Sequence, residues 1–62
     1  MNVDEVIQYF QEKDILIPEI VIKTMKKELL DGPALVLASV NDLKLAGIPV
    51  GLAIRMLALF KD

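Results

Sequence analysis

The sequence predicts an all-α fold, a compact bundle of five helices with three short helices and a longer C-terminal one. Apolar residues recur at helical spacings of three and four along most of the chain. Residues that cap or stop helices separate these stretches, and no segment shows the alternation of a half-buried strand. With 62 residues, the chain has the length of a single small domain, residues 1–62.

The first helix is expected over residues 3–13. Asn2 can cap its start, and Glu5 stands three residues later, at the second position of a capping box. Val6, Ile7 and Phe10 then form one apolar stripe. A short apolar connection over residues 15–17 leads to Pro18.

The second helix is expected to begin at Pro18, which suits a first helical turn. Val21, Met25 and Leu29 follow at spacings of four. We expect this helix to stop at Asp31-Gly32, because glycine tolerates the left-handed conformation of a C-cap.

Two short helices and the last helix complete the bundle. Asp31 can cap a third helix that runs to Leu37, and Ser39 with Asp42 can cap a fourth that ends at Gly47. The last helix is expected from Pro49 to about Phe60.

Composition excludes several kinds of function. The chain has no cysteine, histidine or tryptophan, which rules out a disulfide framework, a zinc finger, and nucleophilic catalysis by histidine or cysteine. Its formal net charge of −2 offers no basic surplus for a nucleic-acid backbone. Yet 55% of the residues are hydrophobic, which is high for so small a domain.

The apolar runs are too short to span a membrane. The acidic N-terminus is wrong for a secretory signal, so an intracellular location, cytoplasmic or nuclear, is expected.

Residues 31–60 resemble the sterile alpha motif (SAM) domain. The resemblance rests on Asp31-Gly32, on Leu35 to Ser39, on Asp42-Leu43, on Gly47-Ile48 and on Gly51 followed by an apolar helix. In the first half, Tyr9 stands where that family has a tryptophan, and Val21 and Met25 stand where it has an aromatic pair.

This resemblance implies a scaffold that self-associates with other SAM domains, head to tail, through a mid-loop surface and an end-helix surface. Such contacts build oligomers or helical polymers. Hetero-association with a different SAM domain or another protein is the alternative.

On the last helix we expect Val50, Ile54, Leu57 and Phe60 to point inward. Leu52, Arg55 and Leu59 would then form an outward stripe, and a second apolar stripe needs a partner. The plainer alternatives are scattered exposed leucines or packing on another part of a longer protein. The expected end-helix surface comprises Pro49, Val50, Leu52, Ala53, Arg55 and Leu59.

For the third and fourth helices the family pattern points Leu35, Val36, Ala38 and Leu43 inward. The expected mid-loop surface comprises Asp31, Ala34, Leu37, Val40 and Asp42. The two acids could pair with Arg55, although helix capping is their main expected role.

Other functions have weaker support in the sequence. Residues 45–54 contain no lysine or arginine, so nucleic-acid binding at the start of the last helix lacks charge. Lys23, Lys26 and Lys27 are better explained as a solvated helix face. The carboxylates are scattered along the helices, so neither an enzyme nor a metal or other cofactor is expected.

Overall fold

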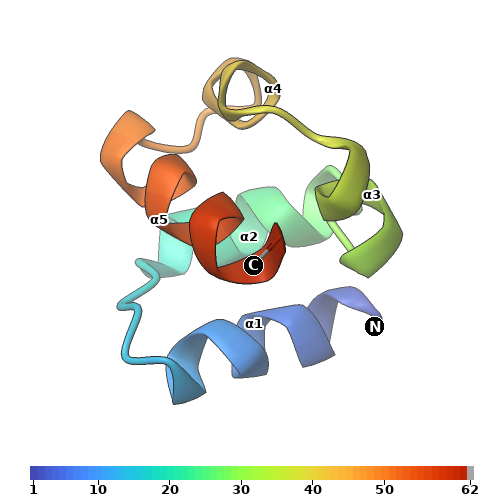
Figure 1. The fold of residues 1–62 in the computed structure, drawn as a ribbon, viewed down its shortest axis with the longest axis vertical. Coiled ribbons are helices and arrows are strands. Elements are labelled where there is room, and N and C mark those ends of the chain that lie inside the picture. Colours follow the sequence, from blue (N-terminus) through green and yellow to red (C-terminus); the bar gives the residue numbers. More distant parts are fainter. Residues whose placement is uncertain (62) are drawn as a thin grey trace.

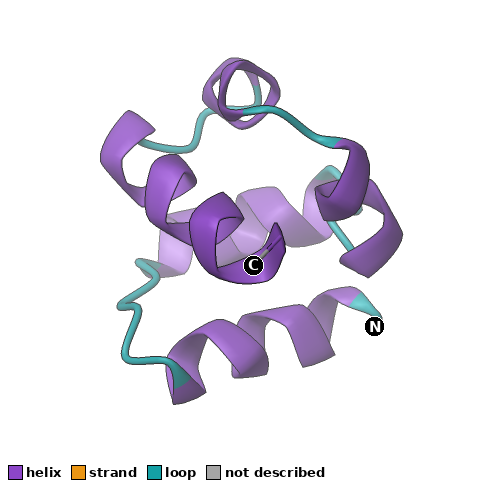
Figure 2. Ribbon diagram, viewed as in Figure 1, coloured by secondary structure: helices purple, strands orange, loops and turns teal. Residues whose placement is uncertain are grey.

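A computed structural model describes residues 1–61, which form five helices and no strand (Figure 1, Figure 2). This confirms the all-α class. The helix bounds are α1 Val3–Glu12, α2 Glu19–Lys27, α3 Gly32–Leu37, α4 Val40–Leu45 and α5 Val50–Lys61.

Side chains cap three helices at their starts, as predicted. Asn2 accepts a hydrogen bond from the Glu5 backbone N–H at 2.9 Å, and the Glu5 carboxylate accepts from the Asn2 N–H at 2.9 Å. Ser39 and Asp42 form the same reciprocal box at α4. Asp31 accepts from the Ala34 N–H at 3.0 Å at the start of α3. These bonds satisfy backbone donors that have no partner within the helix.

Helices α1, α2 and α4 all end in the same backbone arrangement, a Schellman turn. In each, an N–H three residues past the helix donates to the carbonyl of the third-last helical residue at 3.0 Å. The donor and acceptor residues are also apolar neighbours, and each acceptor residue has no exposed surface. The acceptor–donor pairs are Phe10 and Ile15, Met25 and Leu30, and Leu43 and Ile48.

A Schellman turn requires a left-handed residue, and the three turns use different residues for it. Gly47 has φ +103°, Asp14 has φ 63° and Leu29 has φ 54°. A left-handed conformation costs a residue with a Cβ atom about 1–2 kcal/mol, so the turn at Leu29 is strained. The prediction that Gly32 stops the second helix is wrong, because Gly32 is the first residue of α3.

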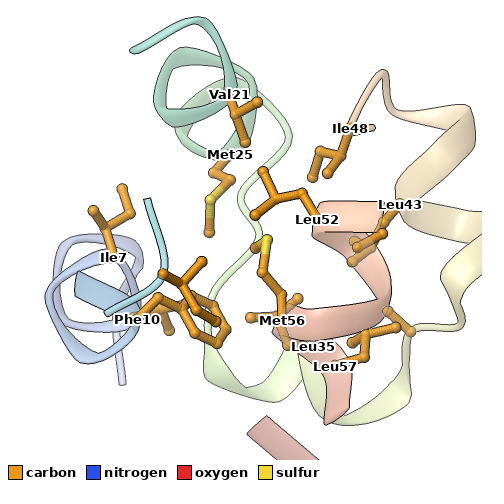
Figure 3. Packing of buried hydrophobic residues seen from close by; sticks show 14 residues of the cluster. Ile7, Phe10, Val21, Met25, Leu35, Leu43, Ile48, Leu52, Met56 and Leu57 are labelled. Carbon is orange, nitrogen blue, oxygen red and sulfur yellow. The ribbon is translucent and has the colours of Figure 1, made fainter. Parts of the chain in front are cut away.

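The core lies between all five helices (Figure 3) and includes the acceptor and donor residues of these turns, with Leu30 packed at its edge. The sequence predicts a core centred on eight residues, of which seven are buried: Val6, Phe10, Val21, Met25, Leu35, Leu43 and Leu57. The eighth, Ile54, is 50% exposed.

The orientation of α5 differs from the prediction. Leu52 is only 5% exposed and Ala53 is fully buried, whereas Val50 and Ile54 lie at the surface. The cause is the turn before α5, which buries Ile48. Leu52, Met56 and Phe60 continue from Ile48 at spacings of four, so this stripe faces the core. Figure 3 shows Leu52 beside Ile48 and near Val21.

The two ends of the chain are tied to the bundle. The Met1 carbonyl accepts from the Gly32 N–H at 3.0 Å, and the Lys61 ammonium donates to the Ala38 carbonyl at the end of α3. A Cβ atom at Gly32 would lie 3.3 Å from the Met1 backbone, so glycine allows this close approach. Tyr9 packs edge-on against Phe60, with ring centroids 5.9 Å apart.

The orientation of α5 can be tested with a matched pair of truncations. Leu52→Ala should lower the free energy of unfolding by about 2–5 kcal/mol, because it leaves a cavity in the core. Ile54→Ala should cost less than about 1 kcal/mol, because half of that side chain is already in water. Urea unfolding followed by circular dichroism measures both. A larger loss for Ile54→Ala would show the originally predicted orientation to be right.

Candidate protein-interaction surfaces

The outward side of α5 is apolar along most of its length. Val50 is 43% and Ile54 50% exposed, and Ala58 continues the stripe at the same spacing of four. Gly51 and Arg55, one position further along, are also exposed. We call these five residues, with Pro49 before them, the α5 surface.

Gly51, the second residue of α5, gives the α5 surface a bare backbone near its start. Its conformation is helical, and a Cβ atom placed there would meet no atom within 4 Å. Neither the backbone conformation nor the packing of this domain therefore requires a glycine. A glycine within a helix is less favourable than alanine.

The second apolar surface runs from the end of α2 through α3 to the start of α4. Leu37 is 87% exposed, and Val36 and Pro33 are exposed beside it, so the outward side of this short helix is wholly apolar. The expectation that Val36 points inward is wrong, because α3 buries mainly Leu35 and Gly32. The α3 surface, as we define it, comprises Leu29, Asp31, Pro33, Ala34, Val36, Leu37, Val40 and Asp42.

All five expected mid-loop residues retain some access to solvent. Leu37 and Asp42 are exposed, and Asp31, Ala34 and Val40 are half-buried. Asp31 and Asp42 are engaged in the capping bonds described above, which agrees with their expected main role. Their remaining carboxylate oxygen atoms can still accept from a partner.

The expected end-helix residues divide into two groups. Pro49, Val50 and Arg55 are exposed, and Leu59 is half-buried. Leu52 and Ala53 belong to the core, so they are not available for contact. Sequence reasoning missed Gly51, Ile54 and Ala58. The spacing of four from Val50 contained this signal, but the apolar residues on every side of α5 concealed it.

The two surfaces differ in place and in charge. In Figure 1, α3 and the start of α5 lie on opposite sides of the molecule. The α3 surface contains Asp31 and Asp42, whereas Val50–Lys61 contains Arg55 and Lys61 and no acid. Each surface therefore complements the other better than it complements itself.

Other exposed groups are more isolated. Leu16, Ile20 and Leu45 are exposed apolar residues outside both surfaces. Lys23, Lys26 and Lys27 are solvated on α2, as expected, and Lys26 lies 3.8 Å from the exposed carboxylate of Asp4.

The hollows and carboxylates give little indication of a chemical site. Asn2, Val3, Asp4 and Lys26 line an open hollow of about 390 Å³. Residues 1–61 bring together no group of three or more possible metal ligands. Over the same residues, no helix has both the length and the apolar character needed to cross a bilayer.

Comparison of the chain with protein-family models, with curated proteins and with solved structures gives no match.

Capping and charge at Asp31 can be separated by two substitutions. Asp31→Ala should lower the free energy of unfolding by about 1 kcal/mol, because the Ala34 N–H loses its acceptor. Asp31→Ser should remain within a few tenths of a kcal/mol of the wild type, because a serine hydroxyl also caps. Thermal unfolding of both variants measures the difference. Equal losses would mean that the charge, rather than the cap, stabilises α3.

Proposed function

We propose that this domain is an intracellular protein-interaction module that self-associates head to tail, with the α5 surface of one copy meeting the α3 surface of the next. The observation that carries the proposal is the pair of exposed apolar surfaces, one on α3 and one on α5, with α3 and the start of α5 on opposite sides of the fold (Figure 1). The resemblance to SAM domains supports the same arrangement. Its role is binding rather than catalysis.

Apolar burial would supply most of the binding free energy. A large aliphatic side chain that leaves water completely contributes about 1.5–3 kcal/mol, and Leu37 is almost fully exposed in the single copy. An exposed ion pair between Arg55 and Asp31 or Asp42 would add no more than about 1 kcal/mol. The charges would therefore orient the contact more than strengthen it.

The size of the domain makes two such contacts a large fraction of its surface. The accessible surface is 4080 Å², so two standard contacts of about 800 Å² per copy would cover about 40% of it. Two such contacts would account for the high hydrophobic content, because apolar residues that are exposed in the single copy would be covered in the assembly.

The two surfaces are different from each other, so their contact is heterologous. Each added copy leaves one free surface of each kind, and growth continues unless the rotation between copies closes a ring. The expected products are filaments or rings rather than a closed dimer.

A mixing experiment distinguishes this arrangement from a symmetric dimer. Ile54→Glu should destroy the α5 surface and Leu37→Glu the α3 surface, so each variant alone should sediment as a folded monomer. Mixed one to one, they should form a heterodimer, because each retains the surface that the other lacks. Analytical ultracentrifugation at rising concentration gives the stoichiometry.

Ile20→Glu is the matched control, since it places the same charge at another exposed helical isoleucine outside both surfaces. It should associate as the wild type does. A wild-type chain that remains a folded monomer at millimolar concentration would refute the proposal. So would a mixture of the two variants that forms no heterodimer.

The apolar character of the contact predicts weak dependence on salt. Raising sodium chloride from 0.1 to 1 M should weaken wild-type association by less than about fivefold, because screening acts on the few charges alone. Sedimentation across a salt series measures this change. A loss of a hundredfold or more would indicate a contact held mainly by ion pairs.

A further inference from the structure

At two positions in this fold, the residue present is less favourable for the stability of the single copy than another residue would be. Leu29 occupies a left-handed turn position that suits glycine, and Gly51 occupies a helical position that suits alanine. One site carries a side chain at a cost, and the other lacks one that would fit.

The packing of the domain does not explain Leu29. Its side chain is 70% exposed, and the apolar contact of the same turn is made by Leu30, whose N–H donates to the Met25 carbonyl. The chain uses Gly47 for the equivalent position after α4. A strained, exposed leucine fits better with a contact outside this copy.

Gly51 presents the opposite shape. It is exposed at the second position of α5, with Ile54 and Arg55 one helical turn further on, and the space above its backbone is open. A bare, exposed backbone beside an aliphatic side chain allows the end of a leucine side chain from a neighbouring molecule to approach closely.

The charges near the two sites differ. Glu28 and Asp31 lie within two residues of Leu29, together with Lys27, whereas Arg55 lies one helical turn after Gly51 and α5 has no acid. Lys26, the basic residue one turn before this leucine, lies close to the Asp4 carboxylate of its own copy.

We propose that Leu29 of one copy seats against the bare backbone at Gly51 of the next copy. This inference rests on the head-to-tail association proposed above and names the central contact of its interface. It also means that both residues favour binding at the expense of the stability of the single copy.

The binary complex of the Ile54→Glu and Leu37→Glu chains tests the contact without polymer formation. The first chain retains Leu29 and the second retains Gly51, so Leu29→Gly is added to the first and Gly51→Ala to the second. Each change should raise the Tm of its own chain by a few degrees. Each should also weaken the complex about tenfold, as measured by isothermal titration calorimetry.

Combining the two changes identifies direct contact. If Leu29 contacts the bare backbone at Gly51, Gly51→Ala should cost little once the partner carries Leu29→Gly, so the doubly changed complex should remain about tenfold weaker than the original. Independent effects would multiply to about a hundredfold and would overturn the contact. Unchanged affinity for either single change, or a lower Tm for Leu29→Gly, would also overturn it.

Asp14→Gly is the matched control, because Asp14 occupies the same left-handed position after α1 and lies outside both surfaces. It should raise the Tm and leave the affinity unchanged. The experiment separates the two proposals. If the heterodimer forms and neither Leu29→Gly nor Gly51→Ala changes its affinity, the contact alone is refuted. If no heterodimer forms, the head-to-tail arrangement is refuted as well.

Discussion

The fold depends on the way in which its helices end. Three times along the chain, a Schellman turn reverses the backbone and places one apolar residue before the turn and one after it into the same core. Phe10, Met25 and Leu43 are the residues before the turns, and none has exposed surface. Because helices this short are unstable alone, the turns both stop them and supply the packing that stabilises them.

The last of these turns also determines which side of α5 faces solvent. Ile48 is buried by the turn after α4, so α5 continues with Leu52 and Met56 toward the core. Val50, Gly51 and Ile54 are thereby left at the surface. A local backbone hydrogen bond between Ile48 and Leu43 thus sets the composition of a surface more than one turn away.

The five helices could be predicted from the sequence, whereas the orientation of α5 could not. Capping residues such as Asn2, Asp31 and Ser39 act on neighbours three residues away, so their effect can be predicted locally. On α5 nearly every position is apolar, and periodicity cannot choose between two possible faces. The strained turn at Leu29 was also invisible, because a leucine gives no sign of a left-handed conformation. The residues expected at the two surfaces are therefore only partly the residues that the fold exposes.

Helix α3 spans six residues, and both of its ends are held by distant parts of the chain. The Met1 carbonyl accepts from its first N–H, and the Lys61 ammonium donates to the carbonyl just past its end. The two extremities of the domain therefore act as a clamp on one short helix. Removing a few residues from either extremity would break one of these two hydrogen bonds, so the smallest fragment that holds α3 at both ends must extend from Met1 to Lys61.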